Sequence, residues 1–252
     1  MEKIIVAIGG GENGRTLDDG TKAPYDTEII DREIVKLTKK TNPNFLFICH
    51  AMNFSEKIEK SYFETMKKIY GDKLKCNCDI LQSKQLDDKD VVNKKISWAD
   101  IIYEGGGDTE SMIKLWKKTK FDVVLKNAWK NGKIICGISA GAVCWFDSCI
   151  SELSDGKYSN LQCLGWIKAH ITPHCNELER LKVAKKYLEN SSKKGILLSN
   201  CSAIEIINDK YKILLSSEKA CCAKASWKNG KYIQKRLCNT KIFKPILNIL
   251  NN

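Results

Sequence analysis

The residues with the clearest chemical potential form a G-x-S-x-G pattern around Ser139, directly after an apolar run at residues 134–138. A buried strand that turns sharply at a serine and passes into a helix forms a nucleophile elbow, which lifts the hydroxyl above the sheet edge. Gly137 and Gly141 suit such a turn, because a Cβ would clash where backbone approaches backbone. The turn would also place the Ala140 N–H at a helix N-terminus, where it can donate to an oxyanion. A tight turn with an incidental serine is the alternative.

A serine nucleophile needs a base, and the chain has only three histidines. His174 follows Thr-Pro just beyond an apolar run, where a loop would deliver it to the active edge of a sheet. His50 ends another apolar run and could reach the same edge. His170 lies inside a strand pattern and is expected on a strand face. The sequence favours His174 as the base, with His50 the next candidate.

Two glycine clusters, residues 9–11 and 105–107, each follow an apolar run. Neither has the spacing of a phosphate-binding loop. A glycine turn can offer backbone N–H groups to an anion, or it can be a tight turn only. Both interpretations remain open for residues 9–11. A functional role is favoured for residues 105–107, because a second oxyanion donor must come from a neighbouring strand end.

Apolar runs bounded by turn residues alternate with helical periodicity in the first half of the chain, which predicts a mostly parallel sheet covered on both faces. From about residue 203 the runs come closer together, and Asn229-Gly230 is a hairpin signal, so we expect an antiparallel C-terminal edge. The tail at residues 242–250 is expected to form a short helix. No repeat or long linker divides the chain, so a single α/β domain over residues 1–252 is predicted. The expected strands are residues 4–8, 45–49, 78–81, 101–103, 134–138, 167–171, 196–198, 203–207 and 213–215.

Composition limits the classes of partner. The formal net charge is +12, but the excess is almost all lysine spread along helical segments, and this favours a solvated surface over a nucleic-acid site. No apolar run approaches the ~20 residues of a membrane span. The twelve cysteines lack paired zinc-site spacing, and the first residues lack an export signal. We therefore expect reduced thiols, no metal, no cofactor and a cytoplasmic location.

The motifs G-I-S-A-G-A, G-G-G-D-T and T-P-H together resemble the peptidase E (dipeptidase E, aspartyl dipeptidase) family of serine peptidases, with cyanophycinase as a more distant relative. The resemblance covers roughly residues 4–215, and the first half is most similar to a peptidase-E-like branch common in Firmicutes. It implies a three-layer α/β/α sandwich related to class I glutamine amidotransferases. It also implies cleavage of short peptides, including dipeptides with an N-terminal aspartate.

Carried over residue by residue, the resemblance makes Ser139 the nucleophile and His174 the base, with the N–H groups of Gly107 and Ala140 as oxyanion donors. The family has a glutamate as the third member of its triad, and the alignment places Asn200 there. Asparagine can accept from an imidazole N–H and orient the ring, but it cannot stabilise an imidazolium by charge.

Two other residues carry weaker expectations. Glu205 lies a strand length beyond Asn200 and is the fallback for the third position. Arg180 follows His174 by a few residues and could pair with an acidic substrate side chain.

The sequence thus predicts a serine peptidase with an acyl-enzyme intermediate. The alternative is a catalytically weak or inactive relative that binds a small amino-acid or peptide ligand. The expected partner is a small peptide substrate, with no nucleic acid and no membrane, and a homodimer is compatible with the sequence.

Overall fold

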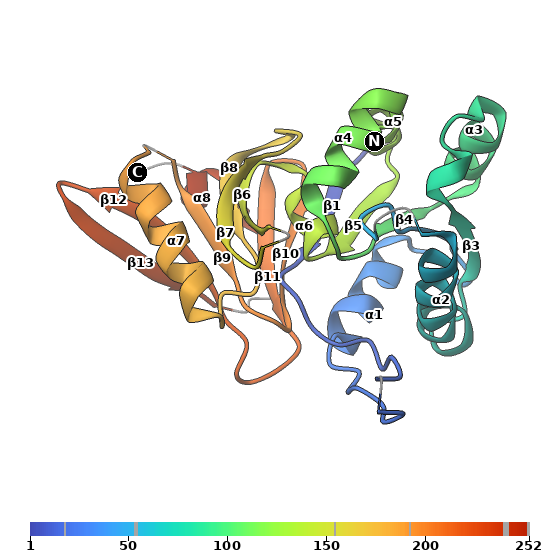
Figure 1. Cartoon of the computed structure of the whole chain (residues 1–252), viewed down its shortest axis with the longest axis horizontal. Helices are drawn as coiled ribbons and strands as arrows, with labels where there is room; N and C mark the ends of the chain where they lie inside the picture. Colours follow the sequence, from blue (N-terminus) through green and yellow to red (C-terminus); the bar gives the residue numbers. More distant parts are fainter. Residues whose placement is uncertain (18, 53–54, 154, 192, 239–241, 251–252) are drawn as a thin grey trace.

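The first strand, β1 (Ile4–Ile8), is an unbroken apolar run and lies inside an eight-stranded sheet (Figure 1). The computed structural model of the chain describes residues 1–17, 19–52, 55–153, 155–191, 193–238 and 242–250. The sheet order is β14-β11-β10-β1-β5-β4-β2-β3. Its parallel strands are β1, β2 (Asn44–Ile48), β3 (Asn77–Leu81), β4 (Ile101–Glu104) and β5 (Ile134–Ile138). The antiparallel edge consists of β10 (Ser202–Ile207), β11 (Lys210–Leu215) and β14 (Lys244–Pro245).

Helices cover both faces of this sheet. Successive β1 side chains point to opposite faces, so Ile5 joins one apolar core while Ile4 and Val6 join the other. The first core receives side chains from α3 (Lys89–Trp98), α4 (Thr109–Thr119) and α5 (Phe121–Lys130). The second core receives them from α1 (Glu28–Leu37), α2 (Glu56–Lys67) and the π-helical turn η1 (Lys68–Lys73). A 3₁₀ turn, η2 (Ser83–Gln85), and a four-residue helix, α6 (Ala140–Val143), lie in connections.

A second sheet of six strands has the order β13-β12-β9-β8-β6-β7. Its outer face packs under α7 (Leu178–Glu189), and α8 (Leu247–Leu250) ends the described chain. In Figure 1 this sheet and α7 lie on the side of the molecule away from α2 and α3. The strands are β6 (Phe146–Glu152), β7 (Tyr158–Gln162), β8 (Ile167–Thr172), β9 (Gly195–Leu198), β12 (Cys222–Lys228) and β13 (Lys231–Leu237).

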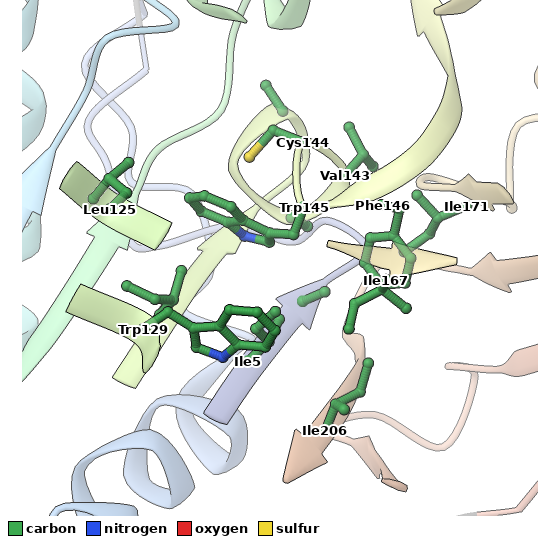
Figure 2. Close-up of a cluster of buried hydrophobic side chains, with 14 of the residues drawn as sticks. Ile5, Leu125, Trp129, Val143, Cys144, Trp145, Phe146, Ile167, Ile171 and Ile206 are labelled. Atoms are coloured by element: carbon green, nitrogen blue, oxygen red, sulfur yellow. The ribbon is translucent and has the colours of Figure 1, made fainter. Parts of the chain in front are cut away.

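The two sheets share one apolar core, centred on Trp145 (Figure 2). Ile5 and Ile206 reach it from the first sheet, and Phe146 and Ile167 reach it from the second. The Trp145 ring is fully buried and stacks on Trp116 of α4, with 5.6 Å between ring centroids. Aromatic burial of this extent stabilises a fixed contact between layers. Trp145 lies two residues beyond the end of α6, so the second sheet is held against the first close to the turn at Ser139.

The α/β class, the mostly parallel sheet and its antiparallel C-terminal edge are confirmed. All nine expected runs correspond to strands, while β6, β7 and β14 were not anticipated. The tail at residues 242–250, expected to be a short helix, contains β14 and is helical only over α8. The Asn229-Gly230 hairpin is present as β12–β13, but it extends the second sheet through β9. All twelve cysteines are free. Across the described ranges, no helix is long and apolar enough to cross a bilayer, and no group of three or more His, Cys, Asp or Glu side chains is placed to hold a metal ion.

Candidate active site

The chain turns sharply at Ser139, between β5 and α6. Ser139 has φ 54° and ψ −113°, a strained conformation for a residue with a Cβ and the expected one for a nucleophile elbow. A Cβ on Gly137 would lie 2.5 Å from the Glu104 carbonyl oxygen, and one on Gly141 would lie 2.2 Å from the same atom. Only glycine fits at either position, so the G-x-S-x-G pattern here is dictated by backbone crowding.

Three consecutive carbonyl groups at the end of β1 anchor the three segments of the site. The Ser139 N–H donates to the Ile8 oxygen at 3.0 Å, and the His174 N–H donates to the Gly9 oxygen at 2.9 Å. The N–H of Cys201, which follows Asn200, donates to the next oxygen, that of Gly10, at 2.8 Å. Three segments spread over more than sixty residues of the chain, from Ser139 to Cys201, are therefore aligned by one short stretch of backbone.

The side chains of these segments form a continuous hydrogen-bonded chain. Ser139 Oγ lies 2.8 Å from His174 Nε2, and His174 Nδ1 lies 2.7 Å from Asn200 Oδ1. With Asn200 Oδ1 accepting from Nδ1–H, the Nε2 lone pair faces the serine hydroxyl, which is the arrangement that a general base requires. Burial lowers the pKa of His174 and outweighs the Asn200 hydrogen bond, which raises it, so the ring is neutral near pH 7.

Gly10 lies directly against this chain. A Cβ built on Gly10 would come within 2.2 Å of Asn200 Oδ1 and 2.4 Å of His174 Nδ1, and its φ is +151°. The first glycine cluster thus gives the histidine and asparagine room to meet. This role was missed in the sequence, although the cluster itself was visible.

The second glycine cluster lies beside the serine. A Cβ on Gly106 would be 3.4 Å from Ser139 Cβ. Gly107 has φ +142° and has no room for a Cβ, which would lie 2.1 Å from the Ala51 oxygen. Among the residues that the structure describes, neither Gly107 nor Ala140 uses its backbone N–H in a hydrogen bond. These two unpaired N–H groups are therefore the candidate oxyanion donors.

The other two histidines have structural hydrogen bonds. The fully buried His50 lies 2.8 Å from the Leu81 carbonyl through Nε2 and accepts from Trp116 Nε1–H at Nδ1. His170, also fully buried, contacts Ser148 Oγ at 3.0 Å and Thr172 Oγ1 at 3.2 Å. Neither contacts Ser139.

Arg180 and Glu205 also have partners within the protein. Arg180 Nε donates to Glu177 at 2.8 Å, and Arg180 Nη2 lies 3.4 Å from Glu152, with 7 % of the side chain exposed. Glu205 is fully buried and pairs with Lys212 at 3.1 Å, so the structure does not bring it to His174 as it does Asn200.

The chain is similar in sequence and in fold to other proteins described as peptidases. The chain is 29% identical to an uncharacterised peptidase, YgaJ, of Bacillus subtilis (strain 168) over 217 residues, which cover 85% of this chain and 88% of that protein. Its fold matches a peptidase from an acI-B1 actinobacterium with a TM-score of 0.65, at 18% identity and 97% coverage of both chains. It also matches a peptidase E candidate from Listeria monocytogenes EGD-e with a TM-score of 0.59, at 18% identity, over 94% of this chain and 100% of that one.

A family model also matches most of the chain. It matches residues 17–214, a stretch that runs from the loop after β1 to the end of β11 and includes Ser139, His174 and Asn200. With most of the chain matched in this way, the protein belongs to peptidase family S51.

Proposed function

We propose that this protein is a serine peptidase that hydrolyses short peptides through an acyl-enzyme on Ser139. The observation that carries the proposal is the hydrogen-bonded chain from Ser139 through His174 to Asn200, with contacts of 2.8 Å and 2.7 Å. A nucleophile, a base and an orienting group within hydrogen-bond reach are the components that acyl transfer requires.

In this mechanism Ser139 Oγ attacks the scissile carbonyl while His174 Nε2 takes the hydroxyl proton. The resulting imidazolium gives that proton to the leaving amine, and a water activated by the same nitrogen then releases the acyl group. Asn200 holds the ring in the tautomer that leaves Nε2 free. The Gly107 and Ala140 N–H groups stabilise the oxyanion, a contribution worth about 3 kcal/mol for each donor.

A fluorophosphonate probe tests whether the serine is activated. The wild-type protein should be labelled, and Ser139→Ala should not. Ser148→Ala is the matched control, because Ser148 also contacts a histidine, His170, but is fully buried in the second sheet. Labelling that persists in Ser139→Ala and disappears in Ser148→Ala would overturn the proposal.

One observation favours a second candidate function, a catalytically weak relative that binds a small amino-acid or peptide ligand. Asn200 stands where the family has a glutamate, and a neutral amide gives no charge stabilisation to the imidazolium. A panel of dipeptides that includes Asp-Leu separates the two. Absence of hydrolysis across the panel, together with absence of labelling, would favour ligand binding.

The resemblance also suggests dipeptides with an N-terminal aspartate as substrates and Arg180 as the residue that binds the acidic side chain, but Arg180 already pairs with Glu177 and Glu152, which argues against this role. The panel tests this directly. The twelve free thiols support a cytoplasmic location for the reaction.

A further inference from the structure

A cleft of about 750 Å3 adjoins the proposed oxyanion site. One wall is formed by Gly107 and the start of α4, and the opposite wall by the β6–β7 hairpin of the second sheet. Gly107 belongs to the lining, so a peptide whose carbonyl accepts from the Gly107 N–H has this cleft directly beside it. The cleft therefore contributes to the choice of substrate.

The charged groups that line this cleft are all acidic. Asp108 and Glu110 come from the α4 side, and Glu152 and Asp155 come from the hairpin, while no described residue of the lining is a lysine or an arginine. This local sign opposes the net charge of the whole chain, which is +12. A cleft lined by one sign of charge attracts ligands of the opposite sign.

Two lysines pair with carboxylates of the cleft but neutralise little of its negative charge. Glu110 pairs with Lys114 at 2.7 Å, and Asp155 pairs with Lys157 at 2.9 Å, but both lysine side chains are more than 70 % exposed. Exposed ion pairs of this kind contribute little and are easily exchanged. A substrate cation can therefore compete for these carboxylates.

Arg180 lies behind the hairpin wall and is not available to an acidic ligand. Its guanidinium donates to Glu177, lies against Glu152, and stacks at 4.5 Å over the Tyr158 ring. An acidic substrate side chain would meet Glu152 before it met Arg180. The arginine positions the acidic wall and offsets part of the Glu152 charge, while Asp108, Glu110 and Asp155 have no arginine partner among the described residues.

We propose that this cleft selects peptides with a lysine or arginine side chain next to the scissile bond, with Glu152 and Asp155 as the residues that determine this preference. The inference rests on the proposed function, since it takes Ser139 as the site where the substrate carbonyl binds. It assigns a cationic substrate class in place of the aspartyl class that the family resemblance suggests.

The decisive experiment measures binding to the Ser139→Ala protein by calorimetry, so that hydrolysis cannot intervene. The dipeptides Lys-Leu and Leu-Lys are each compared with a norleucine counterpart, which has the same carbon chain without the ammonium group. At least one lysine peptide should bind about fivefold or more tightly than its counterpart, and the difference should shrink at high salt. Equal binding of both pairs would overturn the inference.

Variants assign the effect to the cleft. In the same background, Glu152→Gln and Asp155→Asn should each reduce the lysine preference, while Glu64→Gln, on the exposed side of α2, should not. A thermal melt of each variant shows whether its fold is intact. If both cleft variants keep the full preference, the assignment to this cleft is wrong.

The two proposals fail in different ways. Fluorophosphonate labelling of Ser139 with no lysine preference would leave the peptidase in place and remove the cationic specificity. A lysine preference without labelling would keep the specificity of the cleft and remove the peptidase mechanism.

Discussion

Gly10 lies so close to His174 that a single methyl group on its Cα would come within 2.4 Å of the imidazole Nδ1. The same methyl group would lie 2.2 Å from Asn200 Oδ1. The contact between histidine and asparagine thus depends on a residue that supplies no functional group. Its contribution is the space it leaves.

Gly10→Ala should therefore abolish fluorophosphonate labelling by displacing His174 from Ser139. Gly20→Ala is the matched control, because Gly20 also has a positive φ, of +82°, but a Cβ there meets nothing within 4 Å. The control should lose a little stability and keep its labelling rate. Retention of the full rate in Gly10→Ala would mean that the ring tolerates displacement and that its position does not limit the reaction.

Asn200 can be tested by an isosteric change. Asn200→Asp keeps the acceptor at 2.7 Å from His174 Nδ1 and adds a negative charge, so kcat should rise by about tenfold as the imidazolium is stabilised. Asn200→Ala should lower kcat by about tenfold or more, because the ring loses its orienting group. Glutamate is one methylene longer, and the contact with Gly10 leaves no room for it, so Asn200→Glu should bring no gain. An unchanged kcat in Asn200→Ala would show that another group orients His174.

The pH dependence of kcat/KM should follow the neutral form of His174. Burial lowers its pKa, so the base stays unprotonated to a lower pH than free histidine, and the acidic limb should have a midpoint below about 6.5. In Asn200→Asp the added charge favours the imidazolium, and the midpoint should move to higher pH. Initial rates from pH 4.5 to 8 measure both midpoints, and a wild-type midpoint above 7 would contradict this assignment.

Acid should destabilise the fold through His50 and His170. Burial lowers the pKa of His50 to about 4 and that of His170 to about 3, so both stay neutral in the folded protein below the pH at which unfolded histidine is protonated. Above about pH 6.5 the two neutral rings do not reduce the free energy of unfolding. As the pH falls from there towards 4, the free energy of unfolding decreases by up to about 1.4 kcal/mol per pH unit for each ring.

Urea unfolding of the wild type and His50→Gln between pH 7 and 4.5 isolates one of the two rings. The variant should show the shallower loss of unfolding free energy on acidification. The buried Asp31, whose pKa is raised to about 6, acts in the opposite direction but is present in both proteins. Parallel slopes for the two proteins would show that His50 does not take part.

The first sheet and the core of the site could be predicted because their signals are local. Apolar runs mark β1 and β5, and the glycines around Ser139 reflect crowding within a few residues. His174 could be selected because only three histidines exist. None of these predictions depends on contacts between residues that are distant in the sequence.

The strands β8, β9, β12 and β13 were expected, but not that they form a separate sheet. Its edge strand β7 (Tyr158–Gln162) escaped notice because it is polar and has no fully buried residue to mark it. The partners of Arg180 were hidden for another reason. Glu152 lies 28 residues before it in the chain, and only the packing of α7 against the second sheet brings the two together. The acidic cleft follows from that packing, and no local pattern encodes it.

The three anchoring carbonyls at the end of β1 also have a consequence for the order of folding. β1 precedes its sheet neighbours by a long stretch of chain, because these neighbours are β5, which ends at Ile138, and β10, which ends at Ile207. Pairings between segments so far apart form slowly, because long loops must close before any contact rewards them. Ser139, His174 and Asn200 are therefore aligned late in folding. On refolding from denaturant, recovery of fluorophosphonate labelling should lag behind recovery of helical circular dichroism.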